Sequence, residues 1–182
     1  MASYNKEKIR NIALIGHGGE GKTSLLEAML FNTKAIDRLG KVDDGTTVSD
    51  YDAEEIARKM SIGLSVSNVK YKDYKINVID TPGFFDFEGE MISALSVADG
   101  AIVVTQAHGY LSVGTEKAIS YCLEKKIPMM IFVNGVNKEN SDYFKTVDAI
   151  KQKYGNMIAA IEYPIMDGNT ITGYVDVVAQ KA

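Results

Sequence analysis

The residues with the clearest chemical meaning lie near the N-terminus, where residues 16–23 read Gly-His-Gly-Gly-Glu-Gly-Lys-Thr. They fit the pattern Gly-x4-Gly-Lys-[Ser/Thr], between a predicted short strand at 10–15 and helical apolar spacing over 22–32. Glycines permit backbone angles that aim successive N–H groups inward, and the helix that follows presents its positive end. The alternative is a flexible glycine-rich turn. We expect this segment to bind a polyphosphate.

Each residue type in this segment has an expected part in phosphate binding. Lys22 is expected to reach the terminal phosphates, and the Thr23 hydroxyl to ligate Mg²⁺. His17 is expected to line the loop without catalysing. The predicted nucleotide-binding residues here are Gly16, His17, Gly18, Gly19, Glu20, Gly21, Lys22, Thr23 and Ser24.

A second pattern, Asp-Thr-Pro-Gly at residues 80–83, follows an apolar strand. The Asp80 carboxylate can hold Mg²⁺ through water, and the Gly83 N–H can bond a γ-phosphate and move when that phosphate leaves. Alone, Asp-x-x-Gly is more often a plain turn. Because it follows Lys22 by 58 residues, we expect it to work with the phosphate loop as a switch.

The elements that must position these residues follow from hydrophobic spacing. Helices are predicted at 88–98, 115–125 and 141–154, and strands at 101–105, 129–134, 158–165 and 171–178. Segments 64–71 and 76–79 indicate an antiparallel hairpin, and polar residues 33–60 indicate a mobile connection with a helical turn at 54–59. This alternation predicts an α/β fold with a mostly parallel, doubly wound sheet flanked by helices.

Composition narrows the class of protein. The 182 residues are 46% apolar and 24% charged, which is the globular average and excludes disordered and collagen-like chains. A net charge of −4 gives no overall positive field for nucleic acid, so we expect no sequence-specific nucleic-acid binding. The single Cys122 fits a reducing compartment, and no apolar run approaches a membrane span. A cytoplasmic protein with no membrane partner is expected.

Taken together and in order, the motifs resemble those of translational GTPases, specifically the N-terminal G domain of elongation factor G and its paralogues. The resemblance rests on residues 16–23, on 45–51 leading to the first switch at 58–62, on 80–87 and on 132–137. It implies a P-loop NTPase G domain at residues 1–165. Residues 166–182 resemble the start of the family's inserted subdomain, so we expect the chain to be the front part of a longer protein.

The resemblance also implies ligands, partners and further site residues. It implies binding of GTP and GDP with Mg²⁺, GTP hydrolysis, a ribosome partner in protein biosynthesis and, as the expected state, a monomer. Ser61 stands where the family has a metal-binding threonine and keeps the hydroxyl. The implied metal ligands are Thr23, Ser61 and Asp80, the catalytic residues are Lys22 and Gly83, and the base-reading residues are Asn134 and Asn137.

Two departures from the family change what is expected of catalysis and of base choice. Phe84 replaces the histidine that positions the attacking water, and a phenyl ring cannot hydrogen-bond water, so hydrolysis is expected to be slow. Residues 134–137 read Asn-Gly-Val-Asn in place of Asn-Lys-x-Asp. With asparagine in place of aspartate, position 137 loses a charge-assisted bond to guanine, and the amide donor of Asn137 suits the 2-oxo group of xanthine. Gly135 lacks the lysine stem that, in the family, packs along the base.

Three functions therefore stand as hypotheses. The first is a GTPase that is weak alone or stimulated by a partner, and that couples switch rearrangement to ribosome association. The second is a nucleotide-gated ribosome-binding module with negligible hydrolysis or relaxed base specificity. The third is a P-loop ATPase, because the phosphate loop alone does not distinguish the purines.

Other residues are interpreted as structural. Asp43, Asp44, Glu54 and Glu55 are expected to be solvated carboxylates in polar runs, and His108 a loop residue. Cys122 is expected to be an inert thiol in or near the core. Ser-Ala-Leu at residues 93–95 spells the family's last base-contacting motif, but it lies on a predicted helix too early in the chain and is taken as a coincidence.

Overall fold

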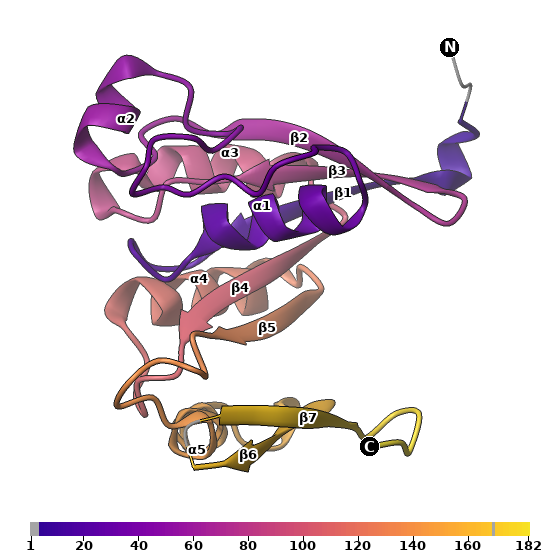
Figure 1. The fold of residues 1–182 in the computed structure, drawn as a ribbon, viewed down its shortest axis with the longest axis vertical. Helices are drawn as coiled ribbons and strands as arrows, with labels where there is room; N and C mark the ends of the chain where they lie inside the picture. Colours follow the sequence, from indigo (N-terminus) through magenta and orange to yellow (C-terminus); the bar gives the residue numbers. More distant parts are fainter. Residues whose placement is uncertain (1–3, 169) are drawn as a thin grey trace. The chain divides into compact units, whose positions relative to one another are not determined.

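The computed structural model describes residues 4–168 and 170–182 and alternates strands with helices (Figure 1). The strands are β1 (Ile9–Ile15), β2 (Ser65–Tyr71), β3 (Tyr74–Asp80), β4 (Gly100–Gln106), β5 (Met129–Asn134), β6 (Glu162–Asp167) and β7 (Thr170–Asp176). The α-helices are α1 (Lys22–Asn32), α2 (Ala53–Arg58), α3 (Glu88–Val97), α4 (Val113–Lys125) and α5 (Tyr143–Tyr154). Short 3-10 helices are η1 (Lys6–Lys8), η2 (Phe85–Phe87) and η3 (Gly155–Met157).

The main sheet has five strands in the order β2-β3-β1-β4-β5, and β6 pairs with β7 in a separate two-stranded sheet. Strand β1 pairs in parallel with β3 on one side and β4 on the other, with Leu14 opposite both Asp80 and Ile102. The edge strand β2 runs antiparallel to β3, as the first arm of a hairpin. The α/β fold class with a mostly parallel sheet flanked by helices, predicted from the sequence, is confirmed.

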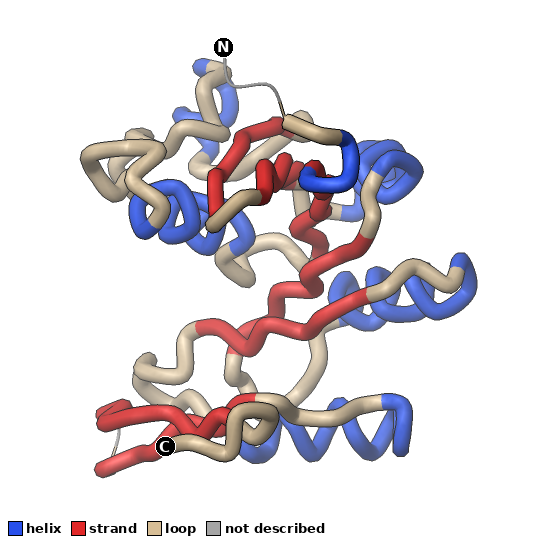
Figure 2. The backbone as a smooth tube through the Cα atoms, turned by 90° about the vertical axis from the view of Figure 1, so that its right-hand side faces the viewer, coloured by secondary structure: helices blue, strands red, loops and turns tan. Residues whose placement is uncertain are grey.

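The chain divides into two compact units, which are described one at a time. The first comprises Met1–Val104 and Val113–Phe132, and the second comprises Thr105–Ser112 and Val133–Ala182. Strands β4 and β5 carry the chain from one unit into the other; Figure 2 shows all strands in red and helices in blue.

The core of the first unit is built on β1, which is buried on both faces. Successive side chains of a strand point to opposite faces, so Leu14 packs with the helix α1 while Ala13 and Ile15 point to the other face. Figure 1 shows α1 in front of the sheet and α3 behind it. The cluster around α1 consists of Leu14, Leu26, Leu30, Val69 and Val78. This packing fixes the end of β1, from which the phosphate loop departs.

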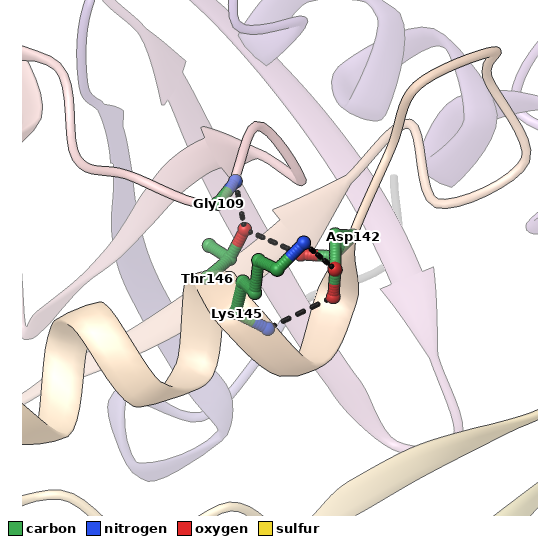
Figure 3. Close-up of polar contacts among 4 residues, drawn as sticks. All are labelled: Gly109, Asp142, Lys145 and Thr146. Carbon is green, nitrogen blue, oxygen red and sulfur yellow. Dashed lines mark hydrogen bonds and ion pairs between the residues drawn. The ribbon is translucent and has the colours of Figure 1, made fainter.

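In the second unit, a polar network fixes the start of α5 (Figure 3). The Asp142 side chain accepts a hydrogen bond from the backbone N–H of Lys145 at 2.9 Å and so caps the helix. The Thr146 hydroxyl, fully buried, donates to the Asp142 carbonyl and accepts from the Gly109 N–H at 2.8 Å. Helix α5 therefore begins at Tyr143, two residues later than its apolar spacing predicted.

The other differences from the sequence prediction are in element boundaries. Helix α4 begins at Val113, two residues earlier than predicted. Strand β6 begins at Glu162, four residues later than predicted. The helical turn expected at 54–59 is α2. It ends at Arg58, and the next residue, Lys59, caps it in the left-handed conformation. Within residues 4–168 and 170–182, no helix is both long and apolar enough to cross a lipid bilayer.

Candidate functional site

The glycine-rich segment curls between the end of β1 and the start of α1. Gly16, Gly19 and Gly21 have φ angles of 134°, 76° and 94°, which L side chains rarely adopt. At Gly16 a side chain would also collide with the Val104 carbonyl oxygen. The conformation requires glycine, and it turns the loop back over the N-terminus of α1, where helix N–H groups attract anions.

Lys22 lies under this loop with 6% of its surface exposed. Its Nζ donates hydrogen bonds to the carbonyl oxygens of His17 at 2.8 Å and Gly16 at 3.1 Å. Burial lowers the pKa of Lys22 to about 8, against the raising effect of the Asp80 and Glu20 charges. The ammonium group has three donors, so after these two bonds one N–H remains for a phosphate oxygen.

Four oxygen-bearing side chains meet beside the first turn of α1. The Thr23 hydroxyl donates to the Asp80 carboxylate at 2.7 Å and lies 3.3 Å from the Ser61 hydroxyl. Ser61 in turn donates to the Asp50 carboxylate at 2.7 Å. The structure thus brings together the three predicted metal ligands, Thr23, Ser61 and Asp80, and adds Asp50.

This cluster has the chemistry of a site for a hard divalent cation. Burial raises the pKa of Asp80 to about 6, despite its bond to Thr23 and the charge of Lys22. Burial also raises the pKa of Asp50, and the two carboxylates repel each other. Among residues 4–168 and 170–182, no hydrogen bond satisfies the buried Asp80 Oδ1, although the Ser49 hydroxyl lies near the carboxylate. Oxygen ligands, two of them anionic, fit Mg²⁺.

Residues 80–83 lie directly on the phosphate loop. A methyl group added to Gly83 would collide with Lys22 Nζ and lie 2.5 Å from the Gly18 amide nitrogen. A methyl group added to Gly18 would lie 2.8 Å from the Phe84 ring. Gly83 therefore lies against Lys22 and Gly18, and the Phe84 ring, 41% exposed, packs on Gly18.

These residues surround a cavity of about 340 Å³. The predicted residues that line it are Gly18, Gly19, Gly21, Lys22, Thr23, Ser24, Ser61 and Gly83. Of the other predicted residues in this unit, Gly16, Glu20 and Asp80 are buried next to the loop, and His17 is half-buried within it. The same cavity is also lined by Asp50, Lys59 and Met60.

Two functional candidates in this unit were missed by sequence reasoning. Asp50 was not predicted as a site residue, because its partner Ser61 lies eleven positions away, beyond α2. Glu27 is buried on α1 and accepts from the backbone N–H groups of Gly40 at 2.9 Å and Val48 at 2.6 Å. It fixes the segment that leads into the first switch. The available signal was a carboxylate one helical turn after Thr23, on the same face of α1.

The expectation that Glu55 is a solvated carboxylate is wrong. Glu55 is 5% exposed, and its Oε1 accepts from the N–H groups of Ile62 at 2.9 Å and Gly63 at 3.1 Å. It also closes the capping box of α2 with Asp52. Glu55 thus fixes the chain just after Ser61. Its neighbour Glu54 is exposed, as predicted, and pairs with Arg58.

The predicted base-reading motif belongs to the second unit. Asn134 ends β5, and its side-chain oxygen accepts from the Gly135 N–H at 2.8 Å. The loop that follows turns back at once, because the Lys138 N–H donates to the Gly135 carbonyl at 3.0 Å. Asn137 is exposed within this turn. The base-reading roles of Asn134 and Asn137 stay predictions.

The remaining predictions concern residues outside the site. His108 lies in a loop and stacks on Tyr110, as expected of a structural residue. Cys122 is buried, and burial raises the pKa of its thiol to about 11, so it is inert. Ser93 lies on α3 and donates to the Gly89 carbonyl of the same helix, which agrees with the interpretation of residues 93–95 as a coincidence.

Comparison with known proteins gives evidence on the family of this chain that is independent of the geometry of the site. The model of the elongation factor Tu GTP binding domain matches residues 7–181. The chain is 35% identical to elongation factor G 2 of Treponema pallidum over 97% of its own length, and 31% identical to an elongation factor G-like protein of Synechocystis over 100%. A crystal structure of a protein from Thermus thermophilus matches 93% of the chain with a TM-score of 0.87 and 34% identity.

The chain is short beside these proteins. It covers 26% of the Treponema relative, 27% of the Synechocystis relative and 25% of the Thermus chain. It therefore spans about a quarter of the length of the proteins it matches, and the activity of a whole protein of this kind is a matter for proposal.

Proposed function

Because the chain belongs to the family of elongation factor Tu GTP binding domains, we propose that it binds GTP and GDP with Mg²⁺, and that it hydrolyses GTP slowly until a ribosome stimulates it. Hydrolysis rearranges the two switches and so couples the nucleotide to ribosome association in protein biosynthesis. The observation that carries the proposal is the curled loop over α1, with Lys22 beneath it and Thr23, Ser61 and Asp80 beside it.

In this proposal the catalytic contribution of the chain is mainly electrostatic. Lys22 holds a γ-phosphate oxygen and balances negative charge that develops during phosphoryl transfer. The Gly83 N–H bonds the same phosphate and releases the second switch when the phosphate leaves. The hydroxyl groups of Thr23 and Ser61 would ligate Mg²⁺. The buried carboxylates of Asp80 and Asp50 would help to hold the ion. The bound cation would neutralise phosphate charge.

Lys22 makes nucleotide affinity dependent on pH. Its pKa is about 8 in the free protein, and a bound phosphate raises it, so binding above pH 8 requires uptake of a proton. Affinity for GDP is expected to fall roughly tenfold between pH 7 and 9. Calorimetric titrations over this range check the prediction. A Lys22→Met variant has no such group, and a slope of equal size in that variant would contradict the assignment.

Base choice is tested by competition among GTP, XTP and ATP for the full-length protein. Guanine is the expected base, with selectivity against xanthine weakened by Asn137. The substitution Asn137→Asp restores a charge-assisted acceptor worth about 1.5 to 3 kcal/mol, so the preference for GTP over XTP is expected to rise by about 10- to 100-fold. Glu139→Gln is a matched control on the same turn. Tighter binding of ATP than GTP by the unsubstituted protein would instead favour an ATPase.

A second function, a nucleotide-gated module with negligible hydrolysis, is favoured by one observation, the Phe84 ring packed on Gly18. Single-turnover hydrolysis with and without ribosomes distinguishes the two. Release of phosphate that ribosomes accelerate supports the GTPase, and a rate that stays at the level of uncatalysed hydrolysis supports the binding module. The cytoplasmic location, the monomeric state and the lack of a membrane partner or of sequence-specific nucleic-acid binding stay predictions from composition and motifs.

A further inference from the structure

Basic side chains gather at the end of the main sheet where β1 and β3 begin and β2 ends. Residues 6–10 lead into β1, and residues 70–75 form the turn of the β2–β3 hairpin with its flanks. In the parallel pair of β1 and β3, Ile9 stands opposite Lys75, so the two segments lie side by side (Figure 1). Residues 6–10 and 70–75 are called the basic end of the sheet below.

The basic end carries a concentrated positive charge. Its basic residues are Lys6, Lys8, Arg10, Lys70, Lys72 and Lys75. Six basic and two acidic residues give it a net charge of +4, in a chain whose net charge is −4. Among residues 4–168 and 170–182, no ion pair involves any of the six basic side chains. The local field is therefore opposite in sign to the one that the net charge of the chain implies.

Two of these lysines face each other across the hairpin. Lys70 and Lys75 stand directly opposite in the antiparallel register of β2 and β3. Like charges at such positions repel each other and destabilise the pair of strands. A bound polyanion would remove this repulsion, so the relief of the repulsion would favour its binding.

Tyrosine rings order part of this surface and leave one ring open. Lys8 Nζ lies 4.5 Å and Arg10 Cζ lies 5.5 Å from the centroid of the Tyr74 ring. These cation–π contacts hold two cations in place before any ligand arrives. Tyr71, whose ring lies beside Lys72, is 55% exposed. An exposed ring next to cations can stack on a base while the cations contact phosphates.

We propose that the basic end binds a single-stranded segment of RNA, with its cations on the phosphates and Tyr71 against a base. Such contacts involve the backbone and the flat face of a base, so they agree with the expected lack of sequence-specific binding. A lipid surface fits less well, because the basic end consists of strand ends and a turn and not of an amphipathic helix. An acidic peptide would leave Tyr71 without a base. The choice of RNA over DNA rests on the proposed association with ribosomes.

This surface is distinct from the proposed nucleotide site. The phosphate loop departs after Ile15, at the other end of the seven-residue strand β1. At a rise of about 3.3 Å per residue, the two ends of this strand are roughly 20 Å apart. Substitutions at the basic end should therefore leave GTP binding unchanged.

The experiment measures binding of a labelled single-stranded RNA to the full-length protein at increasing salt concentrations, by fluorescence anisotropy. A triple variant, Lys70→Gln with Lys72→Gln and Lys75→Gln, is expected to bind the RNA about 10- to 100-fold more weakly at low salt. A plot of the logarithm of the binding constant against the logarithm of the salt concentration should become shallower by about 2, because each phosphate contact to a single strand contributes about 0.7 to its slope.

Two comparisons separate this surface from a general effect of charge. A control variant replaces three exposed lysines of other segments, by Lys125→Gln, Lys126→Gln and Lys151→Gln. It changes the net charge equally and is expected to bind RNA as the unsubstituted protein does. Tyr71→Ala is expected to weaken RNA binding by about fivefold or more, whereas Tyr71→Phe keeps the ring and most of the affinity.

Other outcomes overturn the inference. These are an unchanged affinity and slope in the triple variant, an equal loss in the control variant, and normal RNA binding by Tyr71→Ala. Polyglutamate, phosphatidylserine vesicles or DNA of the same sequence that binds more tightly than the RNA would show that the partner is of another class. GTP binding is measured in the same samples. If the unsubstituted protein binds no GTP, the proposed function fails, whereas the RNA measurements still decide on this surface.

Discussion

Replacement of Lys22 by methionine is expected to weaken binding of Mg²⁺-GTP by about 100-fold or more. The ammonium group is buried under the phosphate loop, and its bonds to His17 and Gly16 hold it against Gly83. The one N–H that remains can make a charge-assisted bond to a phosphate oxygen, which contributes up to about 3 kcal/mol or about 100-fold, and loss of the attraction between the buried charge and the phosphates adds to it. Fluorescence titration with a labelled GDP measures it.

A control variant distinguishes loss of the Lys22 ammonium group from a general loss of positive charge on the protein. Lys70→Met removes an exposed lysine of β2 and is expected to bind normally. Because methionine fills a similar volume in the buried position, Lys22→Met should remain folded by circular dichroism. A folded Lys22→Met variant with unchanged affinity for GTP would contradict the role of the loop.

Replacement of Phe84 by histidine is expected to accelerate GTP hydrolysis by about 100-fold in the presence of ribosomes. The phenyl ring lies on Gly18, beside the Gly83 that would bond the γ-phosphate, so an imidazole there could orient the attacking water. A positioned general acid or base typically contributes about 10²- to 10⁴-fold, and the lower end is expected for a residue added to an existing site. Single-turnover release of phosphate measures the effect.

The neighbouring ring provides the matched comparison for this substitution. Phe85 is exposed to a similar degree, but it faces His17 and Lys117. Phe85→His places the same imidazole one residue along and should leave the rate unchanged. If Phe84→His gives no increase while Phe85→His does, the water-positioning role lies elsewhere. If neither does, Phe84 is not what limits hydrolysis.

The parts of the fold that the sequence could predict are those set by local patterns. Apolar strands and helical spacing indicate the alternation of elements, and the phosphate-loop pattern locates the end of β1 and the start of α1. The hairpin of β2 and β3 follows from alternation around Lys72 and Asp73. These features depend on residues within a few positions of one another, which is why they are readable in one sequence.

The parts that could not be predicted depend on contacts between distant segments. Asp50 reaches Ser61 across α2, Glu27 reaches Gly40 and Val48, and Glu55 reaches past Ser61. In sequence each is a carboxylate in a polar run or on a helix, and nothing local distinguishes a buried acceptor of backbone N–H groups from a solvated charge. The basic end of the sheet is a similar case, because only the register of β1 and β3 brings residues 6–10 beside residues 70–75.

The central claim is that the loop at residues 16–23 binds the phosphates of a guanine nucleotide together with Mg²⁺. Isothermal titration calorimetry of the full-length protein with GTP, with and without Mg²⁺, tests it most directly. The account predicts one nucleotide per chain, much tighter binding with Mg²⁺, and binding weakened by about 100-fold or more in Lys22→Met. Absence of binding under either condition, or binding that neither Mg²⁺ nor Lys22 affects, would contradict it.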